Sequence, residues 1–146
     1  MICFAVLSVN GFGPPYYGRT SLTFDEALLC HRASVFEENS VNFLRRTNFR
    51  LAPGFRALWA FRGKLAAAKA GPQILPGLGD KDFEALLMTP DVNAPDPSFV
   101  EVHVFGFLHH TAISKIQFWP PRDKKDKVFR TRIREICEDR KIEVKE

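Results

Sequence analysis

The stretch from Ser98 to Trp119, SFVEVHVFGFLHHTAISKIQFW, carries the clearest β-strand pattern in the chain. Successive side chains of a strand point to opposite faces, and here the alternation separates a face of valines from a face that carries Glu101 and His103. We predict that the valines pack into the core, whereas Glu101 and His103 line a cleft or a wetter surface. A second strand is predicted over 112–119, and the following Pro-Pro pair ends it because proline cannot donate to the β-ladder.

Toward the N-terminus, an almost continuous apolar run over 2–9 predicts a buried strand. Thr23, with Glu26 three residues later, matches a capping box and predicts a helix over 23–34. His31 falls on or beside the apolar side of that helix. A partly buried structural histidine is therefore favoured over a catalytic one.

The rest of the chain mixes helical and strand patterns. Apolar spacing and capping residues predict further helices over 41–46, 55–70, 81–88 and 123–140. A proline-containing connection is predicted over 89–97, and a short final strand over 142–144. Because distant strands must meet in one sheet, we expect a single α+β domain over 1–146, with a mixed, mostly antiparallel sheet and three or four helices.

The composition is ordinary for a globular chain, with 45% hydrophobic and 26% charged residues. Three cysteines stand without CxxC spacing, which favours a reducing, cytoplasmic setting over a disulfide or zinc framework. The sequence contains no apolar run of the ~18 residues that a membrane span requires. We therefore expect a cytoplasmic protein without a membrane partner.

The net charge of +4 is unevenly distributed, because the chain has no acidic residue between 39 and 79. Basic clusters favour polyanions, mainly through phosphate contacts. Nucleic acid is thus a possible partner, and the alternative is a solvated surface. The basic residues of this segment are Arg45, Arg46, Arg50, Arg56, Arg62, Lys64 and Lys69.

Glu101 and His103 form the first candidate for chemistry. Their spacing puts both side chains on one face of a strand, ~6–7 Å apart along the chain, which suits an acid/base pair. The alternative is an exposed pair on an edge strand. His109 and His110 could suggest a metal site with His103, but no carboxylate or cysteine stands at a metal-ligand spacing, so we expect no metal.

The run YYGRTS over 16–21 is the second candidate. Its two tyrosines are predicted to begin a short strand, and Gly18 allows a backbone to approach a ligand closely. Arg19 and the start of the following helix could bind a phosphate, and Thr20 and Ser21 add hydroxyls. The alternative is a turn with a capping hydroxyl.

These two candidates resemble parts of the ADP-ribosyltransferase fold. The run YYGRTSL resembles the strand that leads into the first helix of that fold and helps to hold NAD. The segments VEVHV and AISKIQF, joined by a turn, resemble its late hairpin, whose first strand carries the catalytic glutamate.

The resemblance implies that NAD is the substrate. It places Tyr17 and Arg19 in the NAD pocket, together with the small residues Gly18, Thr20 and Ser21. It further implies that Glu101 orients the nicotinamide ribose as the ribose gains oxocarbenium character, while a nucleophile of a nucleic-acid or protein target displaces nicotinamide.

Two other hypotheses stay open. The first is a small metal-independent ribonuclease, in which Glu101 acts with His103 or His31 as acid and base while Arg19 stabilises the phosphorane; the YYGRT run also resembles half of a GIY-YIG nuclease motif. The second is a non-catalytic basic domain that binds nucleic acid through 45–69. The transferase hypothesis makes two structural predictions. Arg19 and Glu101 should face one cleft, and the tyrosine-rich bend near residue 17 should share a wall of that pocket with the strand near residue 101.

Overall fold

The computed structural model describes residues 1–50, 55–88 and 99–145. Its strands are β1 (Ile2–Val6), β2 (Thr20–Phe24), β3 (Ala33–Phe36), β4 (Arg56–Leu58), β5 (Glu101–Phe105), β6 (Ile113–Phe118) and β7 (Glu143–Lys145). Its α-helices are α1 (Glu26–Leu29), α2 (Ser40–Arg46), α3 (Arg62–Ala70), α4 (Asp80–Leu87) and α5 (Lys124–Arg140). Single 3₁₀ turns join several of them, as at Pro15–Tyr17, Cys30–Arg32 and Trp59–Phe61.

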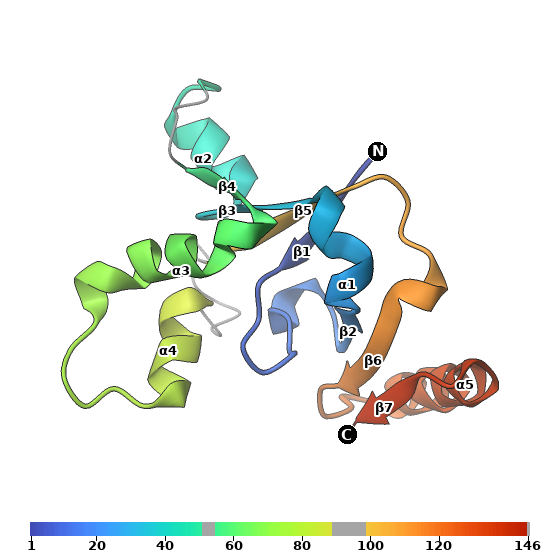
Figure 1. Cartoon of the computed structure of the whole chain (residues 1–146). Helices are drawn as coiled ribbons and strands as arrows, with labels where there is room; N and C mark the ends of the chain where they lie inside the picture. The colour runs from blue at the N-terminus through green and yellow to red at the C-terminus, as the bar shows by residue number, and fades with distance from the viewer. Residues whose placement is uncertain (51–54, 89–98, 146) are drawn as a thin grey trace.

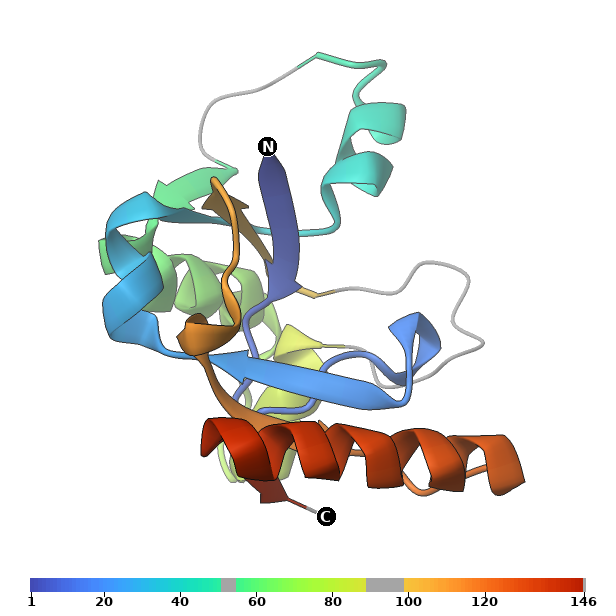
Figure 2. The ribbon, with the colours of Figure 1, turned by 90° about the vertical axis from the view of Figure 1, so that its right-hand side faces the viewer.

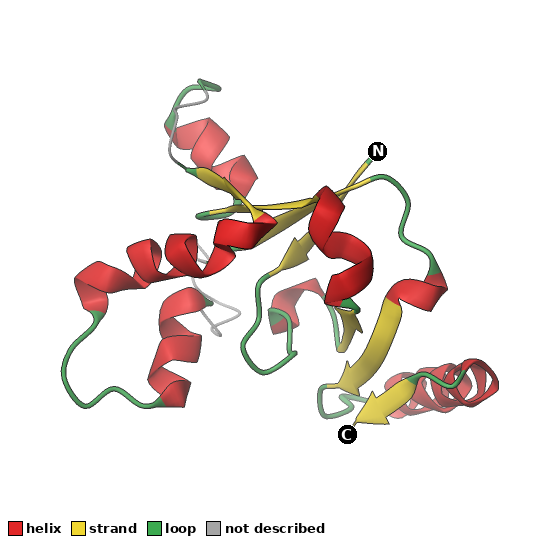
Figure 3. Cartoon of the chain, in the orientation of Figure 1, coloured by secondary structure: helices red, strands yellow, loops and turns green. Residues whose placement is uncertain are grey.

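The strands form two sheets rather than one (Figures 1 and 3). The first sheet has the order β1-β5-β3-β4, with antiparallel neighbours throughout. The second has the order β2-β6-β7, in which β2 is antiparallel and β7 parallel to β6. The α+β class with mostly antiparallel pairing is therefore confirmed. The described residues contain five α-helices, against the three or four expected.

Strand β5 lies in the middle of the first sheet, between β1 and β3. Its valines face the main core with Val35 of β3 and Leu65 of α3, and Val35 and Val100 are fully buried. Complete burial of a valine or leucine side chain contributes about 1.5–3 kcal/mol, so this face supplies a large part of the stability of the first sheet. The predicted valine core is confirmed.

The opposite face of the first sheet carries Glu101 and His103 and is only partly covered. Helix α2 packs on it through Phe43, whose side chain is fully buried and meets Phe36 edge-on at a centroid distance of 5.0 Å. Farther along the same face, Phe4 stays 63% exposed. The prediction of a mixed face is therefore correct, because one helix covers its end near Glu101 and solvent reaches the remainder.

Helix α5 lies beside the second sheet, at the lower edge of Figure 2. Asp123 caps it by accepting a hydrogen bond from the amide of Asp126. Ile133 and Cys137 of the helix pack against Ile116 and Phe118 of β6. Burial leaves Cys137 1% exposed and raises the pKa of its thiol.

The helix predicted from Thr23 is wrong. Thr23 lies in β2 opposite Lys115, and the cap is Asp25, which accepts a hydrogen bond from the Ala27 amide. One short α-helix, α1, and the 3₁₀ turn Cys30–Arg32 follow before β3 begins at Ala33. The strand prediction at Tyr16 and Tyr17 is also wrong, because a 3₁₀ turn occupies 15–17. In both places sheet pairing of β2 with the distant β6 overrides a local helix or strand preference.

The helix predicted over 55–70 begins later than expected. Its first residues form β4, which pairs with β3, and the helix proper starts at Arg62. The helices predicted over 41–46, 81–88 and 123–140 are present, and none of their bounds shifts by more than one residue. The connection predicted over 89–97 lies outside the described residues. In the part of the chain that is described, no helix is both long and apolar enough to cross a membrane.

Phe43 tests how α2 is held over Glu101. We expect Phe43→Ala to lower the free energy of unfolding by about 3–5 kcal/mol, because it leaves a cavity between Phe36 and Phe55. Phe49→Ala is the control, since that ring is 75% exposed. Urea denaturation followed by circular dichroism measures both. Equal small losses would contradict the assignment of Phe43 to the core.

Candidate functional site

A cavity of about 840 Å³ lies between the two sheets and is bounded by their edge strands β1 and β2. Ligand cavities commonly measure about 300–1,000 Å³. Its walls are mainly apolar, and the charged side chains among the described residues that line it are Glu26, Arg62 and Glu101. Tyr17, Gly18, Thr20 and Ser21 line the same cavity. The structure thus brings the tyrosine-rich turn and Glu101 to one pocket.

Glu101 is 5% exposed, which is unusual for a carboxylate. Its Oε1 atom lies 2.6 Å from Nε2 of His103 and 3.4 Å from the backbone nitrogen of Ser40 at the start of α2. The His103 tautomer with a proton on Nε2 donates to this carboxylate oxygen, because an ionised carboxylate only accepts hydrogen bonds. These contacts compensate for the loss of water around the Glu101 carboxylate.

His103 is held by aromatic rings as well as by Glu101. Its imidazole lies nearly parallel to the ring of Phe36, at a centroid distance of 5.9 Å, and meets Phe4 edge-on at 5.2 Å. The predicted Glu101–His103 pair is therefore a direct contact within the sheet. Glu101 is one of the described residues that line the cavity, whereas His103 is not one of them and hydrogen-bonds to Glu101.

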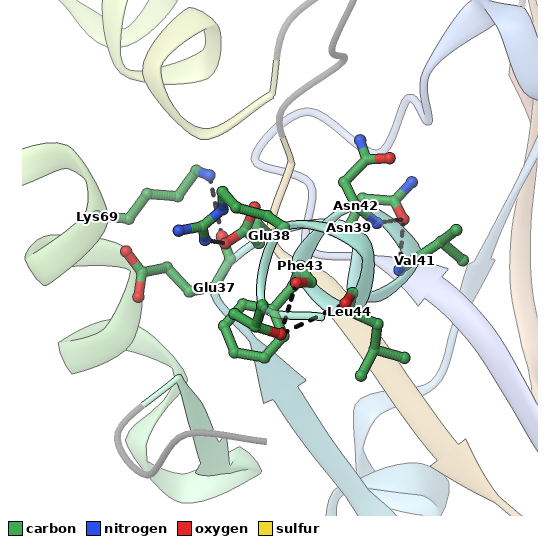
Figure 4. A network of polar contacts seen from close by, with 10 residues as sticks. Glu37, Glu38, Asn39, Val41, Asn42, Phe43, Leu44 and Lys69 are labelled. Carbon is green, nitrogen blue, oxygen red and sulfur yellow. Dashed lines mark hydrogen bonds and ion pairs between the residues drawn. The ribbon is translucent and has the colours of Figure 1, made fainter. Parts of the chain in front are cut away.

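The neighbouring tyrosines have different positions. Tyr16 has a buried hydroxyl, and burial followed by the proximity of Tyr17 raises its pKa to about 12. Tyr17 is 66% exposed and lines the cavity, where its ring meets Phe99 and its hydroxyl accepts a hydrogen bond from Asn39. The side chain of Asn39 also caps α2 by accepting hydrogen bonds from the amides of Val41 and Asn42 (Figure 4). Tyr17 therefore links the 3₁₀ turn to the helix start beside Glu101.

Arg19 does not join the described residues that line the cavity. Its Nη2 atom donates to the carbonyl oxygen of Pro120, and its Nε atom is buried without a partner. Arg19 precedes β2, and its guanidinium is directed to the segment after β6, whereas Thr20 and Ser21 line the cavity. The described lining residues therefore do not form the Arg19–Glu101 cleft that the sequence predicts.

The other polar group of the cavity was missed by sequence analysis. Oε1 of Glu26 accepts hydrogen bonds from Nε1 of Trp59 at 2.9 Å and from Nη2 of Arg62 at 2.7 Å. The Arg62 guanidinium also lies over the Trp59 ring, 4.7 Å from its centroid. Glu26 lies 33 residues from Trp59 and 36 from Arg62 and shares no motif with them, so only the chain fold brings Glu26 to this pair.

The basic segment is spread over several elements, and many of its side chains have partners within the chain. Lys69 donates to the carbonyl of Glu37 at 2.9 Å, as Figure 4 shows, and Arg46 pairs with Glu38. Arg56 bonds Ser34 and lies over Phe105, and Lys64 lies over Phe61. Arg45 and Arg50 are exposed. The segment therefore does not form one uniform basic face.

The remaining histidines lie away from Glu101. His31 is exposed in a 3₁₀ turn, so its predicted partial burial is wrong; the expected helix gives way there to β3. The ring centroids of His109 and His110 lie 4.0 Å apart with the ring planes tilted by 44°, and His109 contacts Thr111. Within the described ranges, no group of three or more His, Cys, Asp or Glu side chains is placed to hold a metal ion.

Gly11 lies in the loop that closes one side of the cavity. Its φ of +83° favours glycine, and a Cβ atom there would overlap Oε1 of the buried Gln117. We expect Gly11→Ala to reduce stability by about 1–2 kcal/mol. Gly63→Ala, in α3 with open space around it, should stabilise by a few tenths up to about 1 kcal/mol. Thermal unfolding that moves both variants in the same direction would contradict this account of the loop.

Comparisons of the chain with protein-family models, with curated proteins and with solved structures found no match. Inference about function therefore starts from the geometry and chemistry of this cavity.

Proposed function

We propose that the protein is an NAD-dependent ADP-ribosyltransferase that modifies a nucleic-acid or protein target. One observation carries the proposal: a buried carboxylate, Glu101, borders an apolar cavity together with Tyr17, Gly18, Thr20 and Ser21. Those are the residues that the resemblance assigns to NAD binding and to catalysis. Their convergence is not a consequence of sequence proximity, because 80 or more residues separate them from Glu101.

The cavity has the properties that this substrate requires. Its apolar walls and the Tyr17 ring suit the flat faces of nicotinamide and adenine, since aromatic and base rings stack. Its hydroxyl groups at Thr20 and Ser21 offer polar contacts at one wall. A buried carboxylate placed against an apolar wall exerts a stronger field than one in water.

In the proposed reaction, the bond between C1′ of the ribose and the nicotinamide nitrogen breaks. Nicotinamide leaves as a neutral molecule with the bonding electron pair, and the ribose gains positive charge. The carboxylate of Glu101 stabilises that charge, because a preoriented anion is most effective where charge develops. A nucleophile of the target then bonds to C1′ and releases one proton.

The position of His103 favours this reaction over RNA cleavage. A nuclease base must reach the hydroxyl proton that it removes, yet His103 is 14% exposed, bonded to Glu101 and enclosed by Phe4 and Phe36. Arg19, expected to stabilise a phosphorane in the nuclease and to line the NAD pocket in the transferase, bonds Pro120 and does not distinguish the two reactions. In the transferase proposal, His103 is a positioning residue that holds the Glu101 carboxylate.

Glu101→Gln tests the catalytic role. We expect nicotinamide release from NAD to fall by about 10²–10³-fold, the usual loss when one preoriented electrostatic group is removed. Chromatographic detection of nicotinamide, with oligonucleotide or cell extract as acceptor, measures the rate. Glu135→Gln, on the exposed part of α5, is the matched control and should retain full activity. Wild-type protein that releases no nicotinamide under these conditions would end the proposal.

His103 tests the positioning role separately. His103→Leu removes the donor to Glu101, and we expect kcat to fall about tenfold or more with little change in KM, because a hydrogen bond to a charged group contributes about 1.5–3 kcal/mol. His103→Gln retains an N–H donor and should restore part of kcat. If the leucine and glutamine variants are equally impaired, His103 serves only to fill space.

A further inference from the structure

Arg62 is the one cation among the described residues that line the cavity. Any anionic part of a ligand in this otherwise apolar space must therefore meet Arg62 or remain without a charged partner. We propose that Arg62 binds the phosphate or diphosphate of a nucleotide, and that Glu26 positions Arg62 and competes with that phosphate. The identity of the nucleotide as NAD rests on the proposed function, whereas the phosphate site does not.

The contacts of Arg62 fix its guanidinium and still leave donors for a ligand. Nη1 donates to the Trp59 carbonyl at 3.1 Å and Nη2 to Glu26 at 2.7 Å, so two of the five N–H groups of an arginine are used. The flat group is further held over the Trp59 ring. A guanidinium fixed in this way loses little rotational freedom when it binds phosphate through its remaining N–H groups.

The site lies on the other side of the first sheet from the Glu101 carboxylate. Register pairing puts Glu101 on the same face as Val6, whereas Ala5, Val102 and Val104 face the core on which α3 packs. Residues of both faces line the cavity, so it extends around β1, the edge strand of this sheet. A ligand that contacts both Glu101 and Arg62 must be long, which suits a dinucleotide better than a single nucleoside.

Glu26 provides a test of the phosphate site, because removing its charge should change phosphate affinity in the opposite direction to removing the charge of Arg62. Its carboxylate neutralises Arg62 and opposes a second anion, yet it is 55% exposed and can yield Arg62 to a phosphate. Glutamine at this position retains an Oε1 acceptor for Trp59 and Arg62 but lacks the charge. The phosphate site therefore predicts opposite effects for Glu26→Gln and Arg62→Gln, whereas a purely structural cluster predicts that both are harmful.

The experiment is isothermal titration calorimetry of the full chain with ADP and, separately, with adenosine at low ionic strength. We expect ADP to bind more tightly than adenosine. Arg62→Gln should weaken ADP binding about tenfold or more, and leave adenosine binding unchanged. Glu26→Gln should tighten ADP binding, and Arg62→Lys should retain part of it. Lys64→Gln, two residues along the same helix and exposed, is the charge-matched control without an effect.

Equal affinities of wild-type protein for ADP and adenosine would overturn the proposal, and so would weaker ADP binding in both Arg62→Gln and Glu26→Gln. Near-UV circular dichroism tests whether each variant is folded. If Arg62→Gln does not fold, the effect of Glu26→Gln and the difference in affinity between ADP and adenosine still test the phosphate site. ADP binding through Arg62 without nicotinamide release from NAD would contradict the transferase and leave the phosphate site standing. Nicotinamide release from NAD, together with unchanged ADP binding in Arg62→Gln, would contradict the phosphate site and leave the transferase standing.

Discussion

The antiparallel pairing of β5 with β1 and β3 is the constraint on which the rest of the structure depends. It fixes the valines of β5 in the core, because every second side chain of the strand points to that face. The same alternation forces Glu101 and His103 onto the opposite face. A shift of the register by one residue would exchange the two faces, so core packing and the position of the carboxylate are one property of the fold.

The two carboxylates that line the cavity belong to two separate groups of hydrogen-bonded residues. Glu101 is stabilised by His103 and the amide of Ser40, and Glu26 by Arg62 and Trp59. Each carboxylate thus has its own donors, which the buried Glu101 requires more than the exposed Glu26. The walls are otherwise mainly apolar, and the charged side chains among the described lining residues stand at these two places. This arrangement favours an extended ligand with one charged and one hydroxyl-bearing part.

Helix α2 links the Glu101–His103 pair to other parts of the chain. Its hydrophobic contact is Phe43, and its N-terminal residues Asn39 and Ser40 reach Tyr17 and Glu101 respectively. The candidate catalytic residue is therefore approached by three elements that are distant in sequence, namely β5, α2 and the turn that contains Tyr17. Phe43 anchors α2 in this arrangement through its contacts with Phe36 and Phe55.

The sequence by itself determined the α+β class, the strand predicted over 99–105 with its valine face, the helix predicted over 123–140 and the Glu101–His103 pair, since each depends on local periodicity or spacing. The structure has the strand at 101–105 and the helix at 124–140. Tertiary structure alone decided that Thr23 belongs to a strand, that Arg19 turns away from the cavity and that Glu26, Trp59 and Arg62 meet. The reason is physical: pairing between β2 and β6, or contact between α1 and α3, joins residues whose separation in the chain leaves no periodic pattern.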